Sequence, residues 1–275
     1  TKEFIMLDEF YYSGRKEETV RTNEEYAKNL FDFLKDKNVR KIFCDPSAAA
    51  FIATVKKLYP KLGALFVKTD NNGNLSWKKE FGNAGNNLGN SAIETSDGYI
   101  ICGALSENST IIKLNKSDGS LLYQKTADNG GNDAYEDLII TPTGIVTVGY
   151  VRAEDNTNTF YTGGEGYITF LDSNGVKLNG VNINQYLSQA YRIKIINNEL
   201  YISGLTDGAN DYGLVKADSA GNILWHTRYG GNSSDHCFGM DIGMDGSVFL
   251  TGHTLSGTEN WDTYTLKVDP SGNKI

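Results

Sequence analysis

Beyond residue 60 the chain consists of short apolar runs that are separated by turns rich in Gly, Asn and Asp, and these runs recur at a regular spacing. Runs of this kind predict β-strands. In each unit, one aliphatic run leads into a turn that contains a glycine. A second aliphatic run of the same unit has a glycine as its last residue. The turn glycines are Gly73, Gly119, Gly175, Gly221 and Gly272, and the glycines of the second run are Gly103, Gly149, Gly204 and Gly252. The first series has intervals of 46, 56, 46 and 51 residues. A period of about 50 residues with about four strands per unit predicts the blades of a β-propeller.

Aromatic residues mark a fixed place in these units. Trp77, Tyr123 and Trp225 each stand four residues after a turn glycine, and each is followed 21 residues later by a hairpin glycine. We expect these aromatic rings to fill the wedge between neighbouring blades. The third unit diverges, with Asn179 at the aromatic position and Asn197-Asn198 at the hairpin.

An acidic residue stands where each of four strands enters its turn. Its carboxylate can accept hydrogen bonds from nearby backbone amides, as in Asx turns. The residues concerned are Asp70, Asp172, Asp218 and Asp269.

The first sixty residues follow a different pattern. A short apolar run at residues 4–7 and a second at 39–44 predict strands. Between them, Thr22 and Glu25 fit a helical capping box. Asp45 and Pro46 suit the N-cap and first position of a second helix. Strand, helix, strand, helix predicts an α/β segment.

Composition divides the chain at the same place. Of 30 glycines, only Gly14 precedes residue 61. Residues 1–60 hold 11 Lys+Arg against 10 Asp+Glu, which leaves 15 against 24 for the remainder. The longer part is therefore a poor candidate for nonspecific binding of nucleic acid, which requires a surplus of cations. No apolar run reaches the roughly 20 residues of a membrane helix, so we expect no membrane span.

The stretch LDEFYYSGRKEETVRTNEEYAKNLFDFL, followed by IFCDPSAAAFIATVKK, resembles the middle of the ribonuclease-H-like nuclease domain of phage terminase large subunits. The resemblance implies a metal-dependent endonuclease that acts in DNA packaging, with carboxylates that hold Mg²⁺ or Mn²⁺. Asp45 matches the carboxylate of the Asp-Pro-Ser-Ala motif. Asp8 ends a neighbouring strand and could approach it. Because the other carboxylates of that family have no counterpart here, we expect the site to be incomplete and Asp45 to serve as a helix cap.

The units of residues 61–275 resemble exported bacterial propeller repeats and the blades of PQQ-type propellers. The repeat divides into units at approximately 61–112, 113–169, 170–215 and 216–266, with a terminal strand at 267–275. The predicted fold is thus mainly β, a propeller of about four blades or an arc of a larger one, preceded by a small α/β fragment. Either the first and last copies of the same strand close a small ring by strand exchange, or the repeats form an arc.

Few residues of the repeats suggest chemistry. His226, His236 and His253 occupy different repeat positions, so they form no HxH or HxxxH metal motif. Asp235-His236-Cys237 invites a catalytic or metal interpretation, but Asp235 has the offset of a turn residue. The acidic stretch 128–137 could hold Ca²⁺ but follows no known loop spacing, so a solvated turn is favoured. Cys44, Cys102 and Cys237 are expected to be buried free thiols.

Two functions from different classes remain open. The first is a noncatalytic propeller module for binding or display, with an unknown protein or glycan ligand, no cofactor, and an exported or cell-surface location. The second is a phage terminase nuclease that acts on DNA in the host cytoplasm. Because the two resemblances belong to different compartments, the chain also has the character of a fragment or a fusion. Its N-terminal residues match neither an initiator Met nor a signal peptide, which suggests that it begins inside a longer protein.

Overall fold

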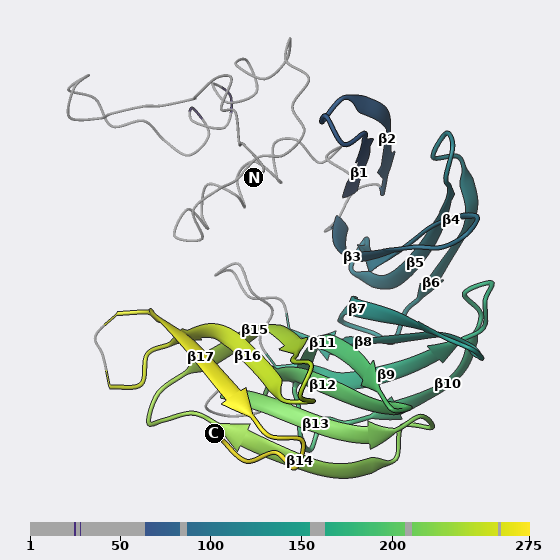
Figure 1. Ribbon diagram of the computed structural model, residues 1–275. Coiled ribbons are helices and arrows are strands. Elements are labelled where there is room, and N and C mark those ends of the chain that lie inside the picture. The colour runs from purple at the N-terminus through teal and green to yellow at the C-terminus, as the bar shows by residue number, and fades with distance from the viewer. Residues whose placement is uncertain are drawn as a thin grey trace. The chain divides into compact units, whose positions relative to one another are not determined.

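A computed structural model describes residues 64–82, 87–154, 163–206, 211–257 and 260–275, together with Glu25 and Lys28. The described part is built of antiparallel strands (Figure 1). These are β1 (Ala64–Thr69), β2 (Leu75–Phe81), β3 (Asn87–Glu94), β4 (Gly98–Leu105), β5 (Asn108–Asn115), β6 (Leu121–Ala127), β7 (Asn132–Thr141), β8 (Gly144–Ala153), β9 (Glu165–Leu171), β10 (Lys177–Asn182), β11 (Gln189–Ile196), β12 (Glu199–Leu205), β13 (Tyr212–Asp218), β14 (Ile223–Tyr229), β15 (Asp235–Ile242), β16 (Val248–Thr254) and β17 (Asp262–Val268).

The strands form successive up-and-down sheets. Three sheets have four strands each, β3–β6, β7–β10 and β11–β14; β15–β17 form a three-stranded sheet, and β1 pairs with β2. Each sheet contacts the next through its first strand, so β7, β11 and β15 each lie against the preceding sheet. This succession of stacked four-stranded meanders is a propeller-like β fold. It confirms the predicted mainly-β class and the count of about four strands per repeat.

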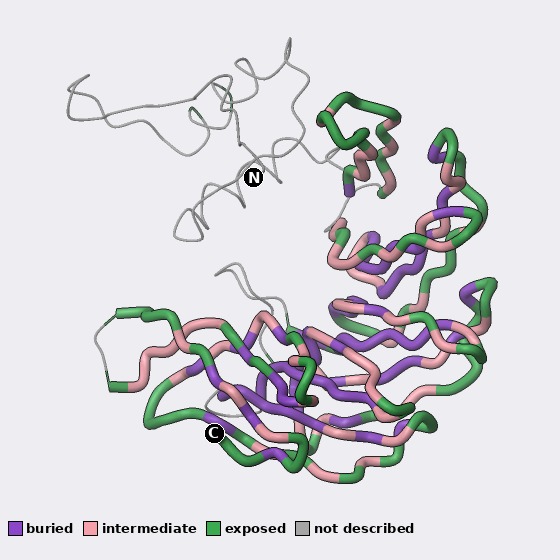
Figure 2. The backbone as a smooth tube through the Cα atoms, in the orientation of Figure 1, coloured by how far each residue is buried: buried purple, intermediate pink, exposed green. Residues whose placement is uncertain are grey.

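A separate hydrophobic core lies between each pair of neighbouring sheets. The largest joins the sheets β7–β10 and β11–β14 and includes Val148, Ile168 and Ile202, all fully buried. Equivalent cores fill the spaces before and after it. Figure 2 shows the buried segments running through the middle of the sheets, with exposed turns at their ends. Cys102 and Cys237 belong to these cores as buried free thiols, as predicted. Cys44 lies outside the described residues.

A β-bulge interrupts the first strand of four sheets at the same repeat position. In each, the register of the strand pairing skips one residue of the first strand, and the glycine of the second strand lies opposite the residue just before it. The skipped residues are Asn90, Glu136, Tyr191 and Phe238, and we call them the bulge row. The paired glycines are Gly103, Gly149, Gly204 and Gly252. A Cβ atom on any of these glycines would lie 1.8–1.9 Å from a backbone carbonyl oxygen of the first strand, so only glycine fits.

The predicted aromatic wedges join neighbouring sheets. The ring of Trp77 lies against Gly119 of the next sheet, so closely that a Cβ atom there would be 2.7 Å from the indole. Tyr123 meets Gly175, and Trp225 meets Gly272, in the same way. The divergent third unit keeps the contact by other means, because Phe170 and Val181 replace the missing aromatic and lie against Gly221.

The predicted Asx turns are also present. Asp70 Oδ1 accepts hydrogen bonds from the backbone amides of Asn72 and Asn74, both at 2.8 Å. The carboxylates of Asp172, Asp218 and Asp269 accept the corresponding pairs of amides. These aspartates are therefore engaged by their own turns.

Three further expectations concern the first sixty residues, the exchange of a strand between the ends of the repeat, and a membrane span. The predicted α/β fragment, residues 1–60, lies outside the described residues apart from Glu25 and Lys28, both helical. Among the described residues, β1 and β17 belong to different sheets and exchange no strand. No helix of the described part is long and apolar enough to cross a membrane.

The bulge requires its glycine, so Gly204→Ala should destabilise the fold. The added methyl group would collide with the carbonyl oxygen of Gln189, which is backbone and cannot move aside, so we expect a loss of about 3 kcal/mol in the free energy of unfolding. Gly130→Ala is the control, because open space surrounds that Cβ and only its positive φ of 79° is strained. It should lose only about 1–2 kcal/mol. Urea denaturation measures both values, and equal losses would contradict the explanation.

Candidate functional site

The bulge row is the place where the repeat presents different chemistry in each sheet. Its members come from β3, β7, β11 and β15, the strands through which successive sheets touch. They are an amide, a carboxylate, a phenol and a phenyl ring. The residues that follow two of them are Asp137 and Arg192. The fold thus brings side chains about 50 residues apart in the sequence to one line across the sheets.

Asp137 connects three sheets at the centre of this row. Its Oδ1 accepts a hydrogen bond of 2.7 Å from the hydroxyl of Ser91 on β3. Its Oδ2 accepts one of 3.1 Å from the backbone amide of Ile193 on β11. Asn90 adds a further link, because its Nδ2 donates to the carbonyl oxygen of Tyr135 at 3.0 Å. Asp137 is therefore committed to holding the first strands together.

Glu136 is the ionisable member of the row. Burial raises the pKa of its carboxyl to about 7, while the positive charge of Arg192 acts in the opposite direction. Nearby Asp137 adds to the rise. Near neutral pH, Glu136 can therefore both donate and accept a hydrogen bond. Arg192 lies beside it and donates from Nη1 to the carbonyl oxygen of Tyr191 at 2.7 Å.

Aromatic rings extend the row over the last sheet. Tyr191 stacks on Phe238, with ring centroids 5.6 Å apart and an angle of 30°. Phe238 in turn meets the rings of His236 and His253 edge-on, at 5.9 and 5.1 Å. Trp261, 45% exposed, lies over both imidazoles. We call these five residues the aromatic cluster.

The residues singled out from the sequence have different outcomes. Asp45 and Asp8 lie outside the described residues. Asp235 is the buried first residue of β15 rather than a turn residue, and it accepts hydrogen bonds from the amide of Gly231 and the hydroxyls of Thr254 and Ser256. Within the described ranges, no three His, Cys, Asp or Glu side chains are grouped to hold a metal.

The acidic stretch 128–137 is also used by the backbone. Asp128 accepts the amide of Gly130 at 2.9 Å. Asp133 accepts the amides of Asn129 and Arg152 at 2.6 and 2.8 Å. The expected solvated turn is therefore found only before residue 132, because from Asn132 the stretch belongs to β7, where Asp133 is buried.

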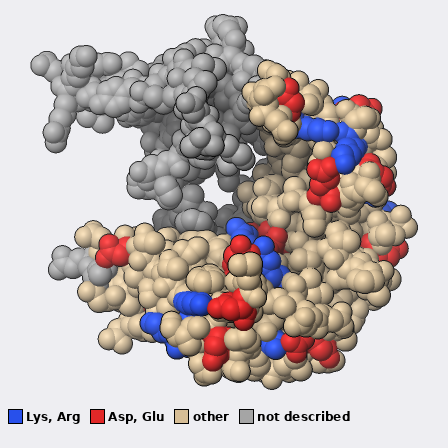
Figure 3. Space-filling view, in the orientation of Figure 1, with Lys and Arg blue, Asp and Glu red and all other residues tan. Residues whose placement is uncertain are grey.

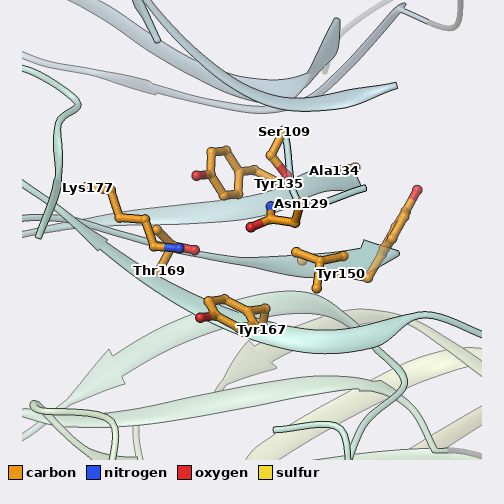
Figure 4. A pocket seen from close by; sticks show the side chains of 10 residues that line it. Ser109, Asn129, Ala134, Tyr135, Tyr150, Tyr167, Thr169 and Lys177 are labelled. Carbon is orange, nitrogen blue, oxygen red and sulfur yellow. The ribbon is translucent and has the colours of Figure 1, made fainter. Parts of the chain in front are cut away.

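A small cavity lies between the sheets β3–β6 and β7–β10 (Figure 4). Tyr135 and Tyr167 stand on opposite sides of it, and Lys177 reaches between them. Its free volume is about 10 Å³, which suits a single water molecule. The hydroxyl of Ser109 lines it and has no hydrogen-bond partner among the described residues. The cavity therefore fits an internal water better than a substrate.

Charged side chains of both signs lie on the face of the described residues that is seen in Figure 3, and the acidic and basic ones are interspersed there. Several are neighbours in ion pairs, such as Lys113 with Asp97 at 2.7 Å and Lys216 with Glu199 at 2.8 Å.

Comparison with known proteins adds little to the geometry. No family model matches the chain, and no curated protein matches it. Among solved structures, it is similar to quinohemoprotein alcohol dehydrogenase from Comamonas testosteroni, with 12% identity and a TM-score of 0.44 over 74% of this chain and 38% of that one. It is also similar to a variant of the apocarotenoid oxygenase of Synechocystis, with 15% identity and a TM-score of 0.39 over 64% of this chain and 45% of that one. At these TM-scores we base the fold assignment on the sheets themselves.

The raised pKa of Glu136 makes a prediction about stability. The folded chain holds this proton more tightly than the unfolded chain, whose carboxyl has a pKa near 4.5. Stability should therefore be highest below pH 4.5 and fall as the pH rises to about 7. Relative to Glu136→Gln, the wild type should lose up to about 3 kcal/mol across this range.

Urea unfolding of both proteins at pH 4.5 and pH 7.5 measures this difference. Arg192→Gln provides a further check, because the loss of the guanidinium should steepen the pH dependence. Parallel profiles for the wild type and Glu136→Gln would show that the carboxyl is solvated.

Proposed function

We propose that residues 61–275 form a noncatalytic propeller-like binding module, and that its ligand is a neutral oligosaccharide. The observation that supports this most directly is the bulge row. Four sheets use the same backbone device at the same position, yet each presents a different side chain there. A purely structural position would favour one residue type, as the paired glycines do.

The chemistry of the row suits a sugar. Hydroxyl groups need both donors and acceptors, which the carboxyl of Glu136 and the guanidinium of Arg192 can supply. The apolar face of a pyranose ring packs on an aromatic ring, and Phe238, which is half-buried and backed by the buried ring of Tyr191, offers one. The mixed surface charge favours an uncharged ligand over a polyanion.

Export or display at the cell surface would fit this function, and so would the resemblance of the repeats to exported propellers. The proposal assigns the ligand to the row formed by the first strands. It requires no cofactor, because side chains of the module make every proposed contact with the sugar.

A glycan array probed with the full chain tests this proposal. Phe238→Ala removes the ring on which the sugar would stack, so we expect affinity for any bound glycan to fall at least about tenfold. Phe249→Ala is the matched control, because Phe249 is an exposed phenylalanine of β16 that lies under Lys267 and away from the row. It should bind as the wild type does.

The array can also contradict the proposal. Binding that Phe238→Ala leaves unchanged would place the ligand elsewhere. A chain that binds no glycan but captures peptides would keep the module and overturn the choice of ligand. Circular dichroism of each variant ensures that a loss of binding is not a loss of folding.

The competing function, a phage terminase nuclease, rests on the resemblance of residues 1–60. Under it, Asp45, with Asp8 nearby, would hold Mg²⁺ or Mn²⁺ and the partner would be DNA. Because one motif carboxylate cannot build a metal site that needs several, we expect no Mn²⁺-dependent cleavage of plasmid DNA. Cleavage that Asp45→Ala abolishes would favour the nuclease over our proposal.

A further inference from the structure

Two histidines of the aromatic cluster face each other across neighbouring strands. His236 on β15 and His253 on β16 are directly paired in the ladder. Nδ1 of His236 and Nε2 of His253 are 3.1 Å apart. In this state one imidazole donates a hydrogen bond to the other.

The same separation is the one that a shared metal ion requires. Imidazole nitrogens bind zinc-like cations at about 2.0–2.1 Å. Two nitrogens 3.1 Å apart would then subtend an angle of about 95–102° at the ion. This value lies between the right angle of square-planar or octahedral coordination and the tetrahedral angle.

We propose that His236 and His253 form a binding site for a divalent transition cation, with Cu²⁺ as the preferred ion. The ion lies between Nδ1 of His236 and Nε2 of His253, and each imidazole keeps its proton on the other ring nitrogen. Water completes the coordination, since the described residues offer no third His, Cys, Asp or Glu at this point. The inference does not depend on glycan binding, because neither histidine belongs to the bulge row.

Aromatic rings and burial fix the position and the protonation state of the two imidazoles. Phe238 packs edge-on against both rings, and Trp261 lies 4.7 Å from His236 and 4.2 Å from His253, measured between ring centroids. These contacts hold the two rings side by side, so binding requires only that the donating imidazole move its proton to its other ring nitrogen and that both lone pairs turn toward the ion. Burial lowers the pKa of His253, and burial with the nearby His253 lowers that of His236 to about 4. Both imidazoles are therefore neutral at pH 7, the form that binds metals.

Copper is preferred for two reasons. Imidazole suits Cu²⁺, Ni²⁺ and Zn²⁺, whereas Mg²⁺ and Ca²⁺ choose oxygen ligands. Among the first three, affinity for a given nitrogen site is highest for Cu²⁺. Two protein ligands do not impose one coordination geometry on the ion. The general order of affinity among these cations therefore determines which of them binds most tightly.

Trp261 supplies a reporter within the site. The test is a titration of the untagged full chain with CuCl₂ at pH 7.5, followed by tryptophan fluorescence. Cu²⁺ between the two imidazoles should quench Trp261, and Trp261→Phe should remove this saturable change while leaving binding intact. The electron paramagnetic resonance spectrum of the Cu²⁺ complex should show coupling to two imidazole nitrogens. NiCl₂ and ZnCl₂ should compete, and MgCl₂ should not.

Variants of the three histidines complete the test. His236→Gln and His253→Gln should each weaken Cu²⁺ binding at least about tenfold and leave one coupled nitrogen or none. His226→Gln is the matched control, since His226 is an exposed histidine of β14 that packs on Tyr186 instead. It should bind as the wild type does. Quenching or nitrogen coupling that survives in His236→Gln and His253→Gln would overturn the proposal, and so would the absence of saturable binding by a folded wild type. Glycan binding by the same proteins is scored separately, so failure of one proposal leaves the other standing.

Discussion

A close approach between two backbones underlies both the sheets and the candidate site. In each of four sheets, a carbonyl oxygen of the first strand lies against the α-carbon of a glycine in the second, at a distance that no side chain permits. That contact lets the first strand carry one extra residue. Repetition then aligns the extra residues into a row. The close approach restricts only the glycine, so the side chain in the bulge can differ from sheet to sheet. The residues at this position are Asn90, Glu136, Tyr191 and Phe238.

Much of this architecture could be predicted from the sequence because its marks are periodic. A turn glycine needs its place in every unit, and Trp77, Tyr123 and Trp225 keep a fixed distance from it because each ring fills the gap to the next sheet. The Asx turns follow from an acidic residue at each strand end. Even the divergent unit was recognisable, although its sequence did not reveal that Phe170 and Val181 replace the missing ring. The first unit inferred from the sequence starts at β1, whereas the first four-stranded sheet starts two strands later, at β3. The spacing of a repeat gives its length but does not show at which strand each sheet starts.

The candidate site was harder to predict, for a physical reason. A bulge shifts the register by one residue, and a pattern of apolar positions does not show that shift. The histidines therefore look unrelated in the sequence, although His236 stands two residues before a bulge and His253 one residue after its glycine, which makes them cross-strand partners. Asp137 was missed as well, because its partners Ser91 and Ile193 are 46 and 56 residues away. A search for polar residues beside the second-strand glycines would have pointed to His253, which follows Gly252, but not to Asp137, which lies on β7 opposite Val148.

The aromatic wedges have a further consequence for cooperativity. Each ring joins only one sheet to the next, and each hydrophobic core likewise belongs to one pair of neighbours. Energetic coupling thus runs along the chain as in a one-dimensional lattice, where a defect is felt strongly by adjacent members and weakly beyond them. Unfolding would then proceed as a front that passes from sheet to sheet. Hydrogen exchange in such a molecule would be graded by position along the stack, with the slowest amides in the sheets that have a partner on both sides.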